Sequence, residues 1–346
     1  MKTTGFYFTL LLFLSIVSCQ TKNLATSASS DGKQVYALVL HGGAGYIKNL
    51  PPAVEKAYKE KIEEALEAGY KVLSDGGSAV KAVQKTIEIM EDSPLFNAGK
   101  GCVLNSLGKP ELDASIMEGK TLNAGAVASV SHIKNPIDAA VLVKDSSRHV
   151  LLAGKGAELF CHEKGMALVP ESYFIVPRRL KQLKRLQAKE KKHETASLPP
   201  AFDGIKKYGT VGCVALDQKG NIAAGTSTGG LMNKQYGRIG DSPIIGAGTY
   251  ADNETCGISC TGIGEYFIRT AAAHSVSDII KFQHLPLLRA QQKVIYKIQD
   301  LGGRGGMIGL DRKANVAWFF NTEGMFRAFK KSNGEKQIRF YALAKH

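Results

Sequence analysis

Apolar residues follow two periods along this chain, one typical of helices and one typical of strands. They recur at helical spacing amid lysine and glutamate over residues 53–73, which predicts an amphipathic helix, and a second helix is expected at 78–90. A short continuous apolar run at 35–40 predicts a buried strand that ends at the sequence HGGAG, residues 41–45. Between residues 103 and 130, short strand-like pieces alternate with glycine and asparagine turns.

The second half of the chain repeats this mixture. Residues 210–217 and 222–224, joined by the turn QKGN, predict a β-hairpin, and residues 307–311 and 316–320 predict another. Further helices are expected at 135–143, after Gly154, and at 264–274, 277–282 and 287–298. Helices and hairpins in both halves indicate an α+β chain, with sheet packed on sheet and helices outside.

Composition indicates a folded protein and argues against one class of partner. Of the 346 residues, 44% are hydrophobic and 22% are charged, which is too apolar for a disordered chain. The net charge of +14 raises nucleic acid as a partner, but much of the excess lies in residues 178–192, a run without an aromatic residue to stack on bases. We therefore expect a basic, solvated linker at 177–209, with one short helix, and no nucleic-acid partner.

The N-terminus has the pattern of an export signal. An apolar stretch at residues 6–17 is too short to span a bilayer comfortably and fits the core of a signal peptide at 1–18. It ends in Ser18-Cys19, which resembles the bacterial lipobox, so Cys19 is the expected site of lipidation and residues 19–34 are the expected tether. A plain signal peptide with an incidental cysteine is the alternative. In the first case the protein is a bacterial lipoprotein anchored to a membrane, and in both it is exported, with the periplasm as the expected compartment.

Five cysteines follow Cys19 in the sequence. An odd number at irregular spacing forms neither a disulfide framework nor a zinc motif. We expect buried free thiols.

One stretch carries most of the chemical signal, residues 208–253, which read YGTVGCVALDQKGNIAAGTSTGGLMNKQYGRIGDSPIIGAGTYADN. Together with HGGAG (41–45), LFNAG (95–99), LDAS (112–115) and NTEGM (321–325), it closely resembles the threonine-type asparaginases and isoaspartyl peptidases, members of the N-terminal nucleophile hydrolases. The resemblance implies a four-layer αββα sandwich built from residues 35–346 as a single hydrolase domain. It also implies self-cleavage before Thr210 into an α chain, 19–209, and a β chain, 210–346, paired as a homodimer of αβ units.

A threonine at this position needs a base, because a hydroxyl alone is a weak nucleophile. Cleavage between Gly209 and Thr210 frees an α-amine with a pKa of roughly 7.7–8.0, so one residue supplies both nucleophile and base. Gly209 is expected to let the scissile peptide adopt a strained conformation. The resemblance implies hydrolysis of L-asparagine and β-aspartyl (isoaspartyl) dipeptides through an acyl-enzyme, with no cofactor for catalysis.

The resemblance also assigns the other site residues. Thr228 is expected to bond the nucleophile hydroxyl, and Thr261 with Asn97 to form the oxyanion hole. Arg238 is expected to bind the substrate α-carboxylate and Asp241 its α-ammonium, because a cation and an anion follow each other in one tight loop. Backbone groups of Gly262 and Gly264 are expected to complete the pocket.

Two further expectations come from the family pattern. A structural sodium ion is expected on backbone carbonyls of Met90, Glu91, Ser93, Phe96, Ala98 and Lys100. His41 is expected to form a structural turn rather than act in catalysis. Ile263 stands where relatives often have threonine, which leaves the substrate preference open.

Other enzyme classes fit less well. Residues 225–229, GTSTG, match the nucleophile elbow of α/β-hydrolases, but that motif needs a helix directly after it, and residues 230–240 have the composition of a loop. No glycine cluster is followed by the GK[ST] of a P-loop. Two alternatives stay open, a glycosylasparaginase of the same superfamily and a catalytically inert surface lipoprotein with this fold.

Overall fold

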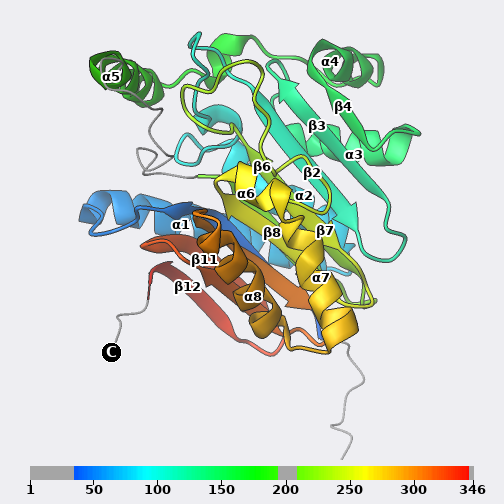
Figure 1. Ribbon diagram of the computed structural model, residues 1–346. Coiled ribbons are helices and arrows are strands. Elements are labelled where there is room, and N and C mark those ends of the chain that lie inside the picture. The colour runs from blue at the N-terminus through cyan, green and yellow to red at the C-terminus, as the bar shows by residue number, and fades with distance from the viewer. Residues whose placement is uncertain (1–34, 194–208, 343–346) are drawn as a thin grey trace, which may run out of the picture. The chain divides into compact units, whose positions relative to one another are not determined.

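The computed structural model describes residues 35–193 and 209–342 (Figure 1). The expected signal peptide, the tether, the lipidation site Cys19 and the second half of the basic linker lie outside these residues. Within them, strands and helices form two β-sheets with helices on their outer faces, so the predicted α+β class is confirmed.

The first sheet contains strands from both sides of the 194–208 gap. Its neighbours pair in the order β12-β11-β1-β5-β6-β2-β3-β4, and every pair is antiparallel except β3 with β4. The strands are β1 Ala37–Gly45, β2 Leu112–Glu118, β3 Ala124–Val130, β4 Leu151–Ala153, β5 Val211–Leu216, β6 Ile222–Thr228, β11 Gly324–Lys331 and β12 Lys336–Tyr341.

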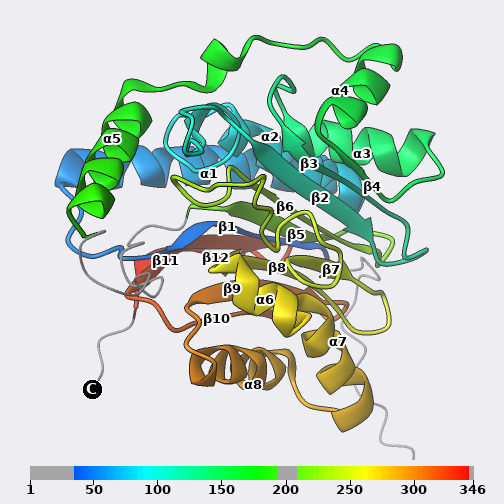
Figure 2. The ribbon, with the colours of Figure 1, turned by 45° about the horizontal axis from the view of Figure 1, so that its top comes forward.

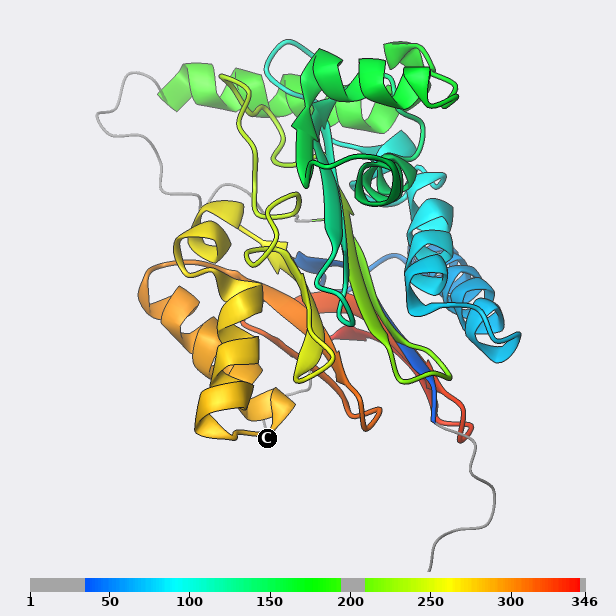
Figure 3. The same ribbon diagram turned by 90° about the vertical axis from the view of Figure 1, so that its right-hand side faces the viewer.

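The second sheet is smaller and wholly antiparallel, in the order β10-β9-β8-β7. Its strands are β7 Thr249–Ala251, β8 Cys256–Gly262, β9 Gly305–Asp311 and β10 Val316–Phe320. Figures 2 and 3 show this sheet lying against the first, with helices beyond each.

Helices from the two halves of the chain cover different faces. Helices α1 and α2 pack on the first sheet, and α7 and α8 pack on the second, on the opposite side of the molecule (Figure 3). The helices are α1 Pro52–Ser74, α2 Ala79–Glu91, α3 Pro136–Ser146, α4 Gly154–Glu163, α5 Pro177–His193, α6 Gly264–Arg269, α7 Ala272–Gln283 and α8 Leu287–Asp300, with 3-10 turns η1 Gly99–Gly101 and η2 Glu171–Phe174. The expected four-layer αββα sandwich is therefore the observed architecture.

Three apolar clusters fill the three interfaces between these layers. Strand β1 shows how one sequence serves two of them, because successive side chains point to opposite faces. Leu38 and Leu40 join the cluster under α1 and α2, whereas Ala37 and Val39 join the cluster between the sheets. Each fully buried leucine contributes roughly 1.5–3 kcal/mol relative to exposure.

Both predicted hairpins are confirmed as β5–β6 and β9–β10. The prediction that β1 ends at residue 40 is wrong, because the strand continues to Gly45. A bulge between His41 and Ala44, with Gly43 at φ +104°, keeps it paired with β11. His41 thus lies in a strand rather than in a turn.

The predicted helix 264–274 is also wrong, because it is broken at Ala271. This residue has φ +44°, in the left-handed region, and α7 starts directly after it. The amides of Ala273 and His274 donate to the carbonyls of Ala247 and Gly246, which fixes where the new helix begins.

The short helix expected within the basic linker is present as α5, but it is 17 residues long and is not wholly solvated. Pro177 suits the first helical turn, and lysine, arginine, leucine and glutamine are good helix formers. Leu183 is buried, and the Arg179 Nε donates to the Gly101 carbonyl at 2.7 Å, so this segment is docked on the domain.

The cysteines agree with the sequence analysis. Those in the described residues, Cys102, Cys161, Cys213, Cys256 and Cys260, are buried free thiols. Burial raises the pKa of Cys102 to about 12 and that of Cys161 to about 11, so both stay protonated. In the part of the chain that the structure covers, no helix is long and apolar enough to cross a bilayer.

Candidate active site

Thr210 lies at the start of β5, in the middle of the first sheet between β1 and β6. It is 7% exposed, and its Oγ1 lies 3.0 Å from Oγ1 of Thr228, the last residue of β6. The pairing of Val211 with Ser227 brings the two threonines together. The amide of Gly230 donates to the Thr228 hydroxyl at 3.0 Å and holds it in place.

Asn97 lies next to the peptide bond before Thr210. Its amide N donates to the Gly209 carbonyl at 3.0 Å, and its carbonyl accepts from the Gly229 amide at 3.1 Å. Its side chain is fixed at both ends, with Nδ2 donating to the Gly230 carbonyl (2.8 Å) and Oδ1 accepting from the Val103 amide (2.7 Å).

Gly209 is required for space rather than for its dihedral angle. Its φ is outside the left-handed region, so the strained conformation expected from the sequence is not what demands glycine. A Cβ at this position would lie 2.8 Å from the Asn97 Cβ and 3.1 Å from the Asn97 nitrogen. A larger residue would push the Gly209–Thr210 bond away from Asn97.

Arg238 and Asp241 lie beside the threonine pair. The Arg238 Nε and Nη2 donate to the two carboxylate oxygens of Glu265, each at 2.9 Å. Asp241 is 4% exposed, and its Oδ2 has no hydrogen-bond partner among the described residues. Burial raises the pKa of Asp241 to about 6, although the Arg238 charge acts to lower it. A buried carboxylate oxygen without a donor suits a cationic ligand group.

Of the other predicted residues, Gly262 lines the pocket, whereas Thr261 and Gly264 do not. Thr261 is fully buried at the end of β8, and its Oγ1 accepts weakly from the Ala44 amide at 3.4 Å. Gly262 lines the pocket, and a Cβ on it would lie 2.5 Å from the Arg304 carbonyl. Gly264 packs on Asp241, where a Cβ would lie 2.8 Å from both its amide nitrogen and its Oδ1.

The pocket formed by these residues is almost closed. Its volume is about 10 Å³, room for about one water molecule. It is lined by Asn97, Gly209, Thr210, Thr228, Gly230, Leu231, Arg238, Gly240, Asp241, Ser242 and Gly262. Gly209 is part of the wall, so movement of this residue would widen the pocket.

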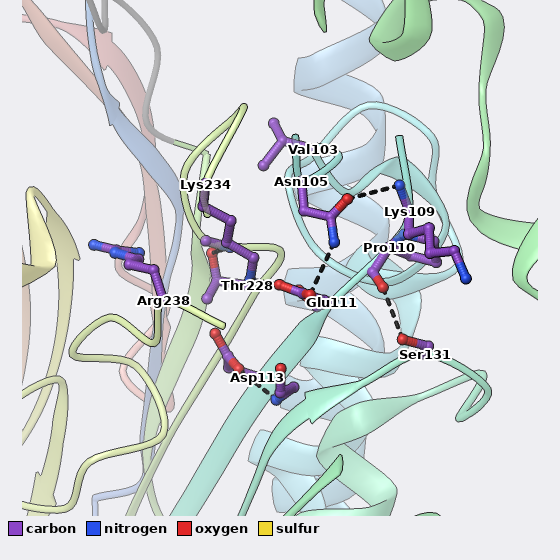
Figure 4. A network of polar contacts seen from close by, with 12 residues as sticks. Val103, Asn105, Lys109, Pro110, Glu111, Asp113, Ser131, Thr228, Lys234 and Arg238 are labelled. Carbon is purple, nitrogen blue, oxygen red and sulfur yellow. Dashed lines mark hydrogen bonds and ion pairs between the residues drawn. The ribbon is translucent and has the colours of Figure 1, made fainter. Parts of the chain in front are cut away.

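A group of charged residues that the sequence did not predict lies behind this pocket (Figure 4). The Lys234 ammonium, whose side chain is 1% exposed, donates to the Glu111 carbonyl at 2.9 Å and lies 3.6 Å from its carboxylate. A Cβ on Gly230 would lie 3.0 Å from this ammonium and 3.4 Å from the Arg238 Nη1. Two cations therefore lie against one wall of the pocket.

Asp113 balances part of this positive charge. It pairs with Thr228 across β2 and β6 and is fully buried, with Oδ1 accepting from the Ser129 amide at 2.8 Å. Burial raises its pKa, while the charges of Lys234 and Arg238 oppose that rise. Asp113 stood in the LDAS motif, so the sequence held a signal for this residue, but it held none for Lys234.

His41 has a different environment from a catalytic base. It is fully buried, and its Nε2 lies 3.0 Å from the Ser259 hydroxyl. Burial lowers its pKa to about 3, so it is neutral at physiological pH. The Ser259 hydroxyl continues to Thr226 at 2.7 Å, deep between the sheets. His41 thus belongs to a buried polar network and does not line the pocket.

The class of protein follows from this arrangement. Two packed sheets, helices on both outer faces, and a threonine at the start of a central strand beside a small pocket define the N-terminal nucleophile hydrolase fold. The family model described as asparaginase matches residues 34–340, and the chain belongs to this asparaginase family.

Individual relatives agree with this assignment. An isoaspartyl peptidase of Salmonella typhimurium is 46% identical over 295 residues, 84% of this chain and 94% of that protein. A plant-type L-asparaginase of Pyrococcus horikoshii is 42% identical over 310 residues, 87% and 98% of the two chains. An isoaspartyl peptidase/L-asparaginase of Mus musculus is 42% identical over 321 residues, 93% and 95%. The family resemblance drawn from the motifs is confirmed, and the chain is a hydrolase.

Proposed function

We propose that this chain cuts its own Gly209–Thr210 bond and then uses Thr210 to hydrolyse L-asparagine and β-aspartyl dipeptides. One observation carries the proposal: the Thr210 and Thr228 hydroxyls lie 3.0 Å apart in a pocket that also contains Arg238 and Asp241. The relatives named as isoaspartyl peptidases and plant-type L-asparaginases favour these substrates over the glycosylasparagine alternative.

In self-processing, the Thr210 Oγ1 attacks the Gly209 carbonyl carbon, the C–N bond to the Thr210 nitrogen breaks, and the hydroxyl proton passes to that nitrogen, which leaves an ester and a free Thr210 α-amine. Water then hydrolyses the ester to give the Gly209 carboxylate and the Thr210 hydroxyl. The Asn97 amide, 3.0 Å from the Gly209 oxygen, supports this step because it donates to the oxygen on which negative charge develops.

In turnover, the freed Thr210 amine takes the proton of its own hydroxyl as Oγ1 attacks the side-chain amide carbon of the substrate. Ammonia, or the amino acid of a dipeptide, leaves with a proton, and water hydrolyses the acyl-enzyme to give aspartate. Arg238 binds the α-carboxylate and Asp241 the α-ammonium, with backbone groups of Gly262 and Gly264 beside them. The partnerless Oδ2 of Asp241 supports the second contact.

Asn97 and Thr261 form the proposed oxyanion hole. The Asn97 amide side chain has two N–H groups, of which one donates to the Gly230 carbonyl. The Thr261 oxygen accepts from a backbone amide, which leaves its own proton to be donated. Each preset donor is worth about 3–4 kcal/mol in the transition state.

The proposed sodium site uses backbone carbonyls around the start of η1. Neutral hard oxygens suit this ion, and carbonyl ligands require no acidic cluster. The loop is compact, since a Cβ on Gly99 would lie 2.3 Å from the Glu91 carbonyl oxygen. In the described residues no group of three histidine, cysteine or acidic side chains is placed to hold a metal. The ion would act on structure alone.

The assembly and location are proposed from the sequence pattern. We propose a homodimer of αβ units, as the family resemblance implies. We also propose that the protein is exported, to the periplasm or anchored to a membrane through Cys19.

The test of the proposed function is intact mass and N-terminal sequencing of the purified protein and of Thr210→Ala. We expect two fragments from the native chain, the smaller beginning Thr-Val-Gly-Cys, and a single inactive chain from the variant. Thr121→Ala, at an exposed turn, serves as the control and should behave like the native chain. A Thr210→Ala protein that is cut and active would refute the proposal.

A further inference from the structure

A second cavity lies next to the candidate active site. Its volume is about 130 Å³, and it shares Asn97 and Gly209 with the pocket of Thr210. The two spaces therefore meet at the bond that precedes the nucleophile. The second cavity is lined by Gly42, Tyr46, Ile47, Leu50, Val54, Tyr58, Leu95, Phe96, Asn97, Arg178, Arg179, Gly209 and Phe326.

Most of this lining is aromatic or aliphatic. Tyr58 is one of the lining residues, and its ring is stacked on Phe326 at 4.4 Å and edge-on to Phe96 at 5.5 Å. The Tyr58 hydroxyl donates to the Leu95 carbonyl at 2.8 Å, which fixes the ring. Val54 is 40% exposed, so the apolar wall reaches the surface. Such a space suits an apolar side chain.

Two guanidinium groups line the same cavity. Arg178 is exposed and its Nη2 donates to the carbonyls of Leu95, at 2.7 Å, and Pro94. Arg179 is 8% exposed and donates to the Gly101 carbonyl. Neither forms an ion pair with a carboxylate within residues 35–193 and 209–342. Their charge therefore lacks an anionic partner from this part of the chain.

We propose that this cavity is the subsite for the leaving amino acid of a β-aspartyl dipeptide, with its apolar side chain against Tyr58 and its α-carboxylate facing Arg178. The inference rests on the proposed function, because it places the aspartyl group beside Arg238 and Asp241. A dipeptide held there and attacked by Thr210 extends its second residue past Asn97 and Gly209.

The alternative substrates make different demands. Ammonia, released from asparagine, needs no subsite, and a sugar leaving group has no carboxylate to pair with Arg178. Only a peptide presents an apolar side chain and a carboxylate together. The cavity therefore selects β-aspartyl dipeptides with a large apolar second residue.

The experiment compares kcat/KM of the processed enzyme for L-asparagine, β-aspartyl-glycine, β-aspartyl-leucine and β-aspartyl-leucinamide. We expect leucine to exceed glycine by about tenfold, since even a single methylene in an apolar pocket is worth about 10-fold or more. Val54→Trp, which narrows the cavity, should abolish that preference and leave asparagine unchanged. Leu159→Trp, an exposed position on α4, is the matched control and should change neither.

A second variant tests the contact between Arg178 and the α-carboxylate of the leaving amino acid. Arg178→Gln should lower kcat/KM for β-aspartyl-leucine by about tenfold, since a charged hydrogen bond is lost, and should not affect the leucinamide or asparagine. Arg178→Lys should retain part of the activity. Equal losses on all four substrates would show that Arg178 only supports the fold and would overturn the inference.

The outcomes also separate this inference from the proposed function. A chain that is neither cut nor active on any substrate refutes the proposed function itself. A cut chain that hydrolyses asparagine and treats glycine and leucine dipeptides alike refutes the subsite alone. In that case the cavity has another occupant, such as the new carboxyl end at Gly209.

Discussion

Arg238 faces two carboxylates that differ in state. Partial burial acts to raise the pKa of Glu265, but its hydrogen bonds and charge pairing with Arg238 hold that pKa below the ordinary value. Asp241 is buried without a donor on Oδ2, and its pKa rises to about 6. Glu265 therefore orients the guanidinium, and Asp241 stays available to a ligand.

Loss of the contact between Glu265 and Arg238 should weaken substrate binding more than it slows the chemical step. Glu265→Gln removes the charge that fixes Arg238, so we expect KM for L-asparagine to rise about tenfold with kcat within about twofold. Steady-state kinetics measure both values. Glu254→Gln, in an exposed ion pair with Lys281 at 2.6 Å, is the control and should change neither. A fall in kcat at unchanged KM would contradict this role.

The raised pKa of Asp241 predicts a pH-dependent stability. Between pH 3.8 and about 6 the folded chain binds more protons at Asp241 than the unfolded chain does, so stability falls as pH rises through this window. Above pH 6 the cost is complete and is on the order of 3 kcal/mol. In uncut Thr210→Ala protein, Asp241→Asn should therefore be stabilising at pH 8 and nearly neutral below pH 3.8.

Denaturant unfolding of both proteins at several pH values measures this difference. If Asp241→Asn raised the free energy of unfolding equally at every pH, the gain would come from packing rather than from loss of the Asp241 charge.

At the scale of elements, period and turn chemistry predicted the regular parts, including the β5–β6 hairpin that presents Thr210. The break between α6 and α7 was not predicted, because its position at Ala271 is set by tertiary hydrogen bonds to residues 246–247. Strands β11 and β12 were not predicted from the sequence for another reason. Arg327, 3% exposed, interrupts the apolar alternation of β11, with its guanidinium over the Phe320 ring at 4.8 Å.

The joint between α6 and α7 carries backbone strain. A left-handed alanine is disfavoured, so Ala271→Gly should stabilise the protein by about 1 kcal/mol. The same substitution at exposed Ala188, within α5, should destabilise it by about 1 kcal/mol. Urea unfolding compares the two midpoints. The joint is unstrained if both substitutions destabilise equally.

At the scale of the whole molecule, motif resemblance predicted residues that are far apart in sequence but meet at one pocket. Asn97, Thr210, Thr228, Arg238 and Asp241 all line it. Lys234 and Glu111 were not predicted, because a buried lysine is recognised only once its surroundings are known. The contact of α5 with the domain was not predicted, because its many exposed lysines give this segment the composition of a solvated linker.

The two products of cleavage should stay together. Strands β5 and β6, which follow Thr210, pair with β1 and β2, which precede it, and the apolar clusters join both sides. We expect the two fragments to elute as one species in native gel filtration and to separate only in concentrated guanidinium chloride. Elution of free fragments without denaturant would contradict the interleaved sheet.

The interleaved strand order also changes how the protein can recover from damage. Before cleavage, both sides of the first sheet belong to one covalent chain, so the sheet of each chain is rebuilt within that chain. In the proposed cut form, the same sheet would be rebuilt by two chains that first have to meet, so we expect recovery to be second order and to fail on dilution. The lifetime of the cut protein in dilute solution would then be set by the height of its unfolding barrier. The uncut precursor would be the last form that can refold from a single denatured chain.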